Sequence, residues 1–443
     1  MEIRDPVHGF ITVSPKVERL LDLPFVQRLR RIKQTAMANL LYPGANHTRF
    51  EHSLGCMHVA GRLARALKLD QKDVHLIEQA ALLHDVGHGP FSHVSEHLLV
   101  QYAPADARDH LEEIHEEITR LAIDGDADLQ RLLGDDKDKV RDLLLKRGVR
   151  DVRHDIISGP FVADKLDYLL RDSHYAGVKY GTFDLERIVR TVALISAGIE
   201  SYMGIDEGGF WAVEQLLLAK HHMNVQVYRH KVRLITDAML VRAIEIGIRE
   251  GDENLSQVYH FRADKTFVDN YLTWDDERLM RTLLASGLPK VQNYAERLFE
   301  RRLFKSIYSQ DTKDFKDALT RNRISRLAKP DLADVEKTLS EVLNRNLDLS
   351  IDSDSVIVDI QSLSNPTFRP PGVKVFEGDI LVQMKDGTRK LAIDYPNTIL
   401  GKTREPEQEV VSIYVPLDGI QDADRKALIT RAKDHISRTL ENV

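Results

Sequence analysis

The stretch that decides the fold is AALLHDVGHGP at residues 80–90. Asp85 lies four residues after Ala81 on an apolar helical face, and His84 follows Ile77 by two helical turns. A carboxylate and an imidazole buried together are costly unless they are paired or bind a metal ion. The glycines and the proline that close the stretch end the helix and leave space beside the pair. The stretch therefore predicts a helical fold with a polar site at one helix end.

Two further helices carry inward-facing polar residues of the same kind. His52 heads an apolar face that continues through Cys56 and Val59, and Asp164 begins another helix with Tyr168 one turn later. Two imidazoles and two carboxylates suit one divalent metal ion, which could be Mn, Fe, Mg, Co, Ni or Zn. A lone His-Asp pair is more often only hydrogen-bonded, but three helices that converge in this way favour a metal site.

Composition limits the class of protein. With 443 residues, 42% hydrophobic and 30% charged, the chain is too long for one core and has an ordinary globular balance. The net charge of -7 argues against a general nucleic-acid binder, and no apolar run approaches the roughly 20 residues of a membrane helix. The charged N-terminus and the single Cys56 indicate a cytoplasmic location without disulfides.

The periodicity predicts a mainly α protein. A short hairpin around residues 10–13 and a helix near Pro24 are expected first, followed by an overwhelmingly helical region from about 48 to 350. Residues 124–147 alternate in charge and indicate a solvated helical insertion. We therefore expect a helical core over residues 1–350, with the metal site within 48–180.

Residues 351–443 have a different character. Strands are predicted at 355–360, 379–383 and 409–415, with an amphipathic helix at about 421–441. We expect these residues to form a small C-terminal α+β module, whose role the sequence does not reveal.

At this point the chain resembles a known family, the HD-domain deoxynucleoside triphosphate (dNTP) triphosphohydrolases. The resemblance includes vertebrate members that carry a sterile-alpha-motif domain, and bacterial relatives. It covers about residues 5–240 and is far more specific than one His-Asp pair. The matching stretches are DPVHG at 5–9, QRLRRIKQ at 27–34, YPGANHTRFEHSLG at 42–55, LHDVGHGPFSH at 83–93, DKLDY at 164–168, RDSH at 171–174 and YRHKV at 228–232.

The resemblance implies a specific set of metal ligands, which are His52, His84, Asp85 and Asp164. Asp164 is favoured over Asp167 because the family places the ligand before the lysine. Helical spacing agrees with this choice, since Asp167 and Arg171 at i and i+4 have the spacing of an ordinary surface ion pair.

The reaction implied is the attack of water on the α-phosphorus, which releases a deoxynucleoside and inorganic triphosphate. The metal ion, Arg49 and Lys165 are expected to neutralise the phosphates. Lys165 shares one helical face with Tyr168 and Asp172, which strengthens its assignment to the site.

Histidines near the metal site are the expected acid–base groups. By resemblance His93, oriented by Glu96, donates the proton to the leaving oxygen, and His115 is a second catalytic histidine. The intrinsic pKa of histidine suits proton donation near neutral pH. The alternative for His115 is a surface position in a charged helix, and His88 either lines the site or only orders the turn.

Substrate recognition is also inferred from the resemblance. Tyr228, Gln34 and Asp172 match residues that pack on the deoxyribose and bind its 3′-hydroxyl, so a dNTP is the expected substrate. The chain departs from the pattern nearby, with Thr35 in place of a leucine and Lys220 in place of an arginine.

A homo-oligomer, dimer or tetramer, is the expected assembly. Activation by a second nucleotide stays open. Asp22 and Arg28 match the spacing of the family's regulatory nucleotide site, but Met1 and Arg4 replace its lysine and asparagine.

Two alternatives stay open. One is an HD-domain nuclease or a phosphatase that acts on another nucleotide through the same metal ion. A single-stranded nucleic acid would require a basic groove with aromatic platforms, and residues 28–33 supply arginines and a lysine without interleaved aromatics. The other is a nucleotide-binding regulator without turnover, which the full set of expected ligands makes less favoured.

Overall fold

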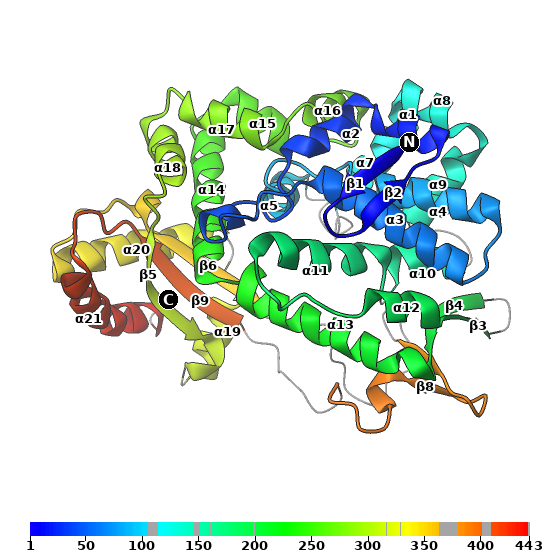
Figure 1. The fold of residues 1–443 in the computed structure, drawn as a ribbon. Coiled ribbons are helices and arrows are strands. Elements are labelled where there is room, and N and C mark those ends of the chain that lie inside the picture. Colours follow the sequence, from blue (N-terminus) through cyan, green and yellow to red (C-terminus); the bar gives the residue numbers. More distant parts are fainter. Residues whose placement is uncertain are drawn as a thin grey trace. The chain divides into compact units, whose positions relative to one another are not determined.

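The computed structural model describes residues 1–104, 114–145, 151–159, 161–197, 200–315, 317–327, 329–362, 380–400 and 409–441. The chain forms two compact units (Figure 1). The first comprises residues 1–229, 253–280 and 367–403, and the second comprises 230–252, 281–366 and 404–443. The fold is mainly helical, as the sequence predicted. Among the described residues, no helix is long and apolar enough to cross a membrane.

The first unit opens with an antiparallel hairpin of β1 (Glu2–Asp5) and β2 (Gly9–Thr12), in which Asp5 pairs with Gly9. Helices α1 (Pro15–Leu21) and α2 (Pro24–Arg28) follow, each with proline in its first turn, where the missing amide hydrogen costs nothing. The expected hairpin and the helix at Pro24 are therefore confirmed.

Three helices form the centre of the first unit: α3 (Arg49–Ala66), α4 (Gln71–Leu83) and α11 (Ala163–Ala176). Both α4 and α11 pack against α3. A capping box fixes the start of α3, because Thr48 and Glu51 satisfy each other's backbone amides. The predicted ligands lie in the first turns of α3 and α11 and at the end of α4. The packing of α4 and α11 on α3 holds these helix ends close together.

Shorter helices surround this centre, and two of them correct the sequence prediction. Helices α8 (Ala127–Leu133) and α9 (Lys137–Leu144) occupy the segment that was expected to be solvated, but Leu129 and Leu143 pack into the core. One face of each helix is therefore buried. The other helices here are α5 (His93–Tyr102), α7 (Ile114–Gly125), α10 (Val152–Ser158), α12 (Leu185–Thr191), α13 (Phe210–Met223), α15 (Glu253–Tyr259), α16 (Lys265–Tyr271) and the part of α17 (Asp276–Leu284) that precedes residue 281.

A four-stranded sheet in the first unit was not predicted in full. Its order is β3-β4-β7-β8, with β3 (Val192–Ala197), β4 (Glu200–Asp206), β7 (Leu381–Gln383) and β8 (Arg389–Leu391). β4 pairs with β7 in parallel, and the other pairs are antiparallel. The strand expected at 379–383 is present from Leu381, and Asp379 lies outside the described residues. β3 and β4 fall in a region expected to be helical.

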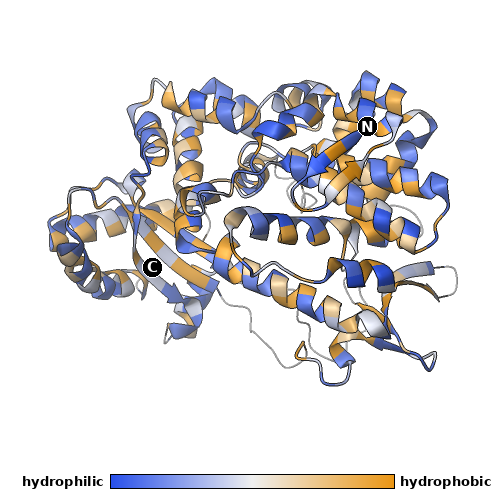
Figure 2. Cartoon of the chain, in the orientation of Figure 1, coloured by the Kyte–Doolittle hydropathy of each residue, from blue (hydrophilic) through white to orange (hydrophobic). Residues whose placement is uncertain are grey.

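The second unit packs helices on a three-stranded antiparallel sheet of order β5-β9-β6. Apolar residues run along β9, which is the central strand (Figure 2). Its strands are β5 (Lys305–Asp311), β6 (Ile357–Ser362) and β9 (Glu409–Val415), and its helices are α14 (Lys231–Arg249), α18 (Pro289–Phe299), α19 (Ala318–Ile324), α20 (Lys329–Leu347) and α21 (Asp422–Glu441).

The boundary predicted at residue 350 differs from this division. Within 351–443, β7 and β8 extend the sheet of the first unit, whereas β6, β9 and α21 belong to the second. Long-range strand pairing, which local sequence does not encode, decides this allocation. The strand near 355–360 and the terminal helix at 421–441 are confirmed as elements.

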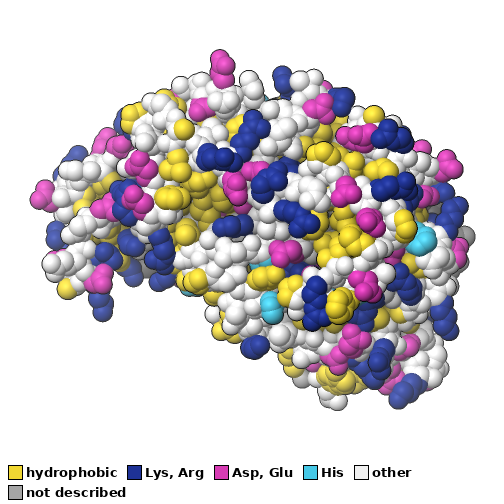
Figure 3. Space-filling view, turned by 45° about the horizontal axis from the view of Figure 1, so that its top comes forward, with side chains coloured by type: hydrophobic (Ala, Val, Ile, Leu, Met, Phe, Trp, Pro, Cys, Tyr) yellow, Lys and Arg dark blue, Asp and Glu magenta, His cyan; other side chains and the backbone are white. Residues whose placement is uncertain are grey.

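Basic and acidic side chains are interspersed over the face shown in Figure 3, in keeping with the modest net charge of -7.

Candidate active site

The site is built around the turn that follows α4. Helix α4 ends at Leu83, so His84 is its C-cap and Asp85 lies just beyond it. Arg28 holds the turn from below by donating hydrogen bonds to the carbonyls of Val86 and His88, at 2.8 and 2.7 Å. A side chain at Gly87 would collide with the backbone of α7, which explains why glycine stands there. The glycine thus permits close packing and does not simply open space.

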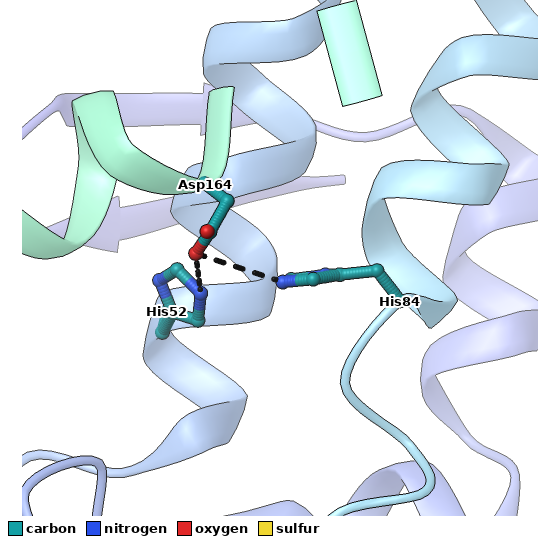
Figure 4. Close-up of side chains that lie close together, drawn as sticks. All are labelled: His52, His84 and Asp164. Carbon is teal, nitrogen blue, oxygen red and sulfur yellow. Dashed lines mark ion pairs between the residues drawn. The ribbon is translucent and has the colours of Figure 1, made fainter. Parts of the chain in front are cut away.

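Three predicted ligands converge on one point (Figure 4). Asp164 Oδ1 lies 3.1 Å from His52 Nε2 and 3.9 Å from His84 Nε2. The other nitrogen of His84, Nδ1, is 2.8 Å from the carbonyl of Ala81, an arrangement that leaves Nε2 as the ligating atom. Both Nε2 atoms are buried, and neither has a well-directed hydrogen bond within the described residues.

Asp85 lies at the edge of this group. Its Oδ1 is 3.2 Å from Nε2 of both His84 and His88, and its Oδ2 is 2.5 Å from Nη1 of Arg49. Although burial alone would raise the pKa of Asp85, the Arg49 guanidinium and the two histidines hold it well below its usual value. Asp85 is therefore ionised and available to a cation.

The charges around His52 fit a bound divalent cation. Burial lowers the pKa of His52, but the carboxylates of Asp164 and Asp167 outweigh burial and raise it to about 10. The cluster thus favours a positive charge between its carboxylates. Unpaired ring nitrogens that face a carboxylate are the donor set of a divalent transition metal. His52, His84, Asp85 and Asp164 would hold the ion.

Asp167 is not on the surface, which corrects the sequence prediction. Asp167 and Arg171 are both fully buried, and they form a bidentate ion pair at 2.9 Å. Asp167 Oδ2 also accepts a hydrogen bond from His52 Nδ1 at 2.8 Å. The i, i+4 spacing of Asp167 and Arg171 predicted their ion pair correctly. The pair is buried because this face of α11 packs against α3.

Glu96 gathers three histidines. His88 Nδ1 and His115 Nδ1 lie 2.7 and 2.9 Å from Oε1, and His93 Nδ1 lies 2.8 Å from Oε2. The rings of His88 and His115 stack with their centres 4.0 Å apart. Although burial favours the neutral acid, the histidines hold the pKa of Glu96 well below its usual value. Glu96 is thus a carboxylate that can orient all three rings.

A cavity of about 280 Å³ unites these groups. His93 is the most exposed of the three histidines, with 66% of its side chain accessible. Arg49 is almost fully buried, yet it reaches the cavity through its guanidinium. The cavity wall includes, of the predicted site residues, Gln34, Arg49, His84, Asp85, His93, His115, Asp164, Lys165 and Tyr168.

Four predicted residues are absent from the wall that the described residues form: His52, Glu96, Asp172 and Tyr228. His52 and Glu96 lie behind it and contact residues that form it. Asp172 and Tyr228 belong together, because the Tyr228 hydroxyl donates to Asp172 Oδ2 at 2.7 Å. His47, which the sequence prediction did not use, is 2.6 Å from the other oxygen of Asp172.

The structure also gives the surroundings of Lys220 and Arg28, two residues that the sequence analysis singled out. Burial, helped by the neighbouring Lys165, lowers the pKa of Lys220 to about 8, so the two lysines share one electrostatic environment. Arg28 is 1% exposed and donates hydrogen bonds to the backbone carbonyls of Trp274, Val86 and His88. Activation by a nucleotide near Asp22 and Arg28 stays a prediction.

Comparison with known proteins agrees with this geometry. The HD-domain model matches residues 49–169, and the model of the HD-associated region matches 183–392. An uncharacterised protein of Methanocaldococcus jannaschii, MJ1154, is 30% identical over 449 residues, which cover all of this chain and 84% of that one. The chain belongs to the HD-domain family.

Two more comparisons extend this result. Chicken deoxynucleoside triphosphate triphosphohydrolase SAMHD1 is 26% identical to this HD-domain protein over 382 residues, which are 76% of this chain and 62% of SAMHD1. A crystal structure of a hypothetical protein from Aquifex aeolicus is 27% identical, with a TM-score of 0.71 over 98% of this chain and 99% of that one. The HD domain and the donor set together make this protein a metal-dependent phosphohydrolase.

Proposed function

We propose that this HD-domain protein hydrolyses dNTPs to deoxynucleoside and inorganic triphosphate. The observation that carries the proposal is the cavity itself, whose wall combines metal ligands, two cationic side chains and three histidines that contact one carboxylate. The similarity to SAMHD1, whose name states this reaction, supports the choice of substrate. The proposal extends the coarser assignment of a metal-dependent phosphohydrolase.

The cationic residues bind the phosphate chain. Arg49 and Lys165 line the same cavity as Asp164, and Arg49 is paired with Asp85 until a phosphate competes for it. Such fixed cations stabilise the charge that spreads over the phosphate oxygens in the transition state. A bound divalent ion would add Lewis-acid stabilisation at the same place.

The chemical step moves one oxygen and one proton. A water oxygen bonds to the α-phosphorus, the bond from that phosphorus to O5′ breaks, and O5′ takes up a proton. His93 is the donor, because it is the accessible member of the Glu96 cluster and its Nδ1 is held 2.8 Å from Glu96. His115 and His88 occupy the other Glu96 oxygen and fix the carboxylate.

The sugar lies towards Asp172 and Tyr228. Tyr168 lines the cavity, and its ring centre lies 6.2 Å from that of Tyr228. Asp172 can accept a hydrogen bond from the 3′-hydroxyl of the sugar. Tyr228 and His47 hold the carboxylate in place for that contact.

The decisive experiment is hydrolysis in water enriched in ¹⁸O. The purified protein, loaded with Mn, is incubated with each dNTP and each ribonucleoside triphosphate, and the products are separated by chromatography. We expect deoxynucleoside and triphosphate, with the label in the triphosphate. Asp85→Asn removes a ligand and should abolish turnover, whereas Asp128→Asn, a change at an exposed helix position, should not.

Other products would reassign the protein. Nucleoside monophosphate with pyrophosphate would place the attack at the same phosphorus with a different leaving group. No release from any nucleotide, alone or in mixtures, would overturn the proposal in favour of a nuclease, another phosphatase or a regulator.

A further inference from the structure

We infer that the N-terminal hairpin turn, residues 5–9, positions the metal-binding His52 through Asp167. The turn contributes two side chains, His8 and Asp5, which reach the buried Asp167–Arg171 pair. The inference rests on the metal site alone and does not depend on which nucleotide is hydrolysed. Its test is a metal-binding measurement without nucleotide, so its failure is distinguishable from failure of the proposed reaction.

A continuous chain of contacts links the turn to the metal ligand. His8 Nε2 lies 2.7 Å from Asp167 Oδ1, across 159 residues of sequence. Asp167 Oδ2 in turn lies 2.8 Å from Nδ1 of His52. A carboxylate that accepts the Nδ1 hydrogen fixes the tautomer of an imidazole and leaves its Nε2 lone pair for a metal. In His52, Nε2 is the atom that faces Asp164.

The second side chain of the turn holds the cation of the pair. Asp5 Oδ2 lies 2.8 Å from Nη1 of Arg171, while Asp5 Oδ1 accepts the backbone amides of Val7 and His8 at 2.8 Å each. Asp5 therefore shapes the turn that presents His8 and also anchors Arg171. Each carboxylate oxygen has a partner, so rotation of either carboxylate breaks a contact.

The facing helix is adapted to this network. Gly55 lies one turn after His52 on α3, and a Cβ atom there would collide with Asp167 and Arg171. The side chains of His8, Asp167 and Arg171 are at most 2% exposed. Charges buried so completely are strongly coupled, because the loss of one partner leaves another unpaired in a medium that solvates it poorly.

Contacts with Arg171 hold the Asp167 carboxylate beside His52. The Arg171 guanidinium donates two hydrogen bonds of 2.9 Å to Asp167, one to each oxygen. If Asp167 rotates away, His52 Nδ1 loses its acceptor and the ring can present the wrong nitrogen to the ion. Loss of an outer contact of this kind typically reduces metal affinity about 10–100-fold.

The test compares three variants by competition for Zn²⁺ or Co²⁺ with a chromophoric chelator. His8→Ala should bind the ion about 10–100-fold more weakly. His8→Gln places an amide Nε2 near the position of the imidazole Nε2 and should restore most of the affinity. His58→Ala is the matched control, because the His58 ring lies 5.3 Å from that of His8 and no contact joins it to Asp167 among the described residues. It should bind like the wild type.

Spectra of the Co²⁺-loaded proteins give a second readout. We expect the visible bands of His8→Ala to shift from those of the wild type, because a His52 ring that is no longer fixed changes the ligand field. Thermal unfolding of the metal-free proteins separates folding from positioning. If His8→Ala does not fold, Asp5→Asn, which keeps the size of the side chain and weakens only the Arg171 contact, replaces it and should also lower affinity.

Three results would overturn the inference. Wild-type affinity and spectra in a folded His8→Ala would show that the turn does not act on His52. If His8→Ala does not fold, wild-type affinity in Asp5→Asn would show that the turn does not act on His52. Equal losses in His8→Ala, His8→Gln and His58→Ala would show a general structural effect.

Discussion

Asp167 accepts a hydrogen bond from His52 over 2.8 Å, and neither side chain reaches solvent. Asp164, three residues earlier on the same helix, faces the opposite nitrogen of that ring at 3.1 Å. One imidazole therefore lies between two carboxylates with different environments. Asp164 faces the cavity, and Asp167 is sealed into an ion pair with Arg171.

The first prediction separates these two carboxylates. Asp164→Ala should lose the metal ion but should destabilise the metal-free protein less than Asp167→Ala, because the side chain of Asp164 is 34% exposed and that of Asp167 is fully buried. Asp167→Ala should lower metal affinity and also cost about 3–5 kcal/mol, since it leaves Arg171 without its main buried partner. Metal content by mass spectrometry and urea denaturation of the metal-free proteins measure the two effects. Equal stabilities of the two variants would contradict the distinction.

The second prediction concerns Glu96. Glu96→Gln should reduce kcat about 10²–10⁴-fold, since the amide orients the histidines less well and removes the charge that stabilises a protonated ring. Metal content should stay at that of the wild type, because the expected ligands lie elsewhere. His88, Glu96 and His115 could themselves hold an ion, as their donor atoms lie within 4.8 Å of one another. Loss of bound metal in Glu96→Gln would therefore assign the cluster to a cation and not to proton transfer.

The third prediction tests sugar recognition. Tyr228→Phe removes the hydrogen bond of 2.7 Å to Asp172 and leaves the ring in place. A hydrogen bond to a charged group contributes about 1.5–3 kcal/mol, so we expect kcat/KM for dNTPs to fall roughly 10–100-fold. Steady-state kinetics with dNTPs and ribonucleotides measure it. Tyr180→Phe changes an exposed tyrosine and is the control. Equal values of kcat/KM for Tyr228→Phe and Tyr180→Phe would show that Tyr228 does not take part in substrate recognition.

Helical periodicity was sufficient to predict the centre of the site. His52, His84 and Asp164 each continue or begin an apolar face, and the structure brings their donor atoms together. Periodicity could not place Asp167, because an i, i+4 Asp–Arg pair has the same spacing whether it is exposed or buried. The informative signal was Gly55 on the facing helix, whose small size only makes sense once α11 is packed against α3.

Long-range pairing limited the prediction of the rest. Residues 192–197 are a short apolar run, which periodicity alone does not distinguish from a buried helical segment. Their strand partner β4 also pairs with β7, more than 170 residues later, through Ile205 and Val382. No local pattern encodes that contact, so the sheet was missed and the boundary at residue 350 was placed where helical periodicity gives way to strand patterns.

The last prediction is a pH dependence of stability that originates at His58. Burial, helped by His8, Arg62 and Arg65, lowers the pKa of His58 from 6.5 to about 4 in the folded protein. Between these values the unfolded chain binds a proton that the folded chain does not. The free energy of unfolding should therefore fall as the pH drops from about 6.5 to 4. Urea denaturation from pH 7.5 to 5 should show a smaller loss in His58→Gln than in the wild type. His75→Gln, at an exposed position of α4, should follow the wild type, and parallel curves for all three proteins would contradict the assignment.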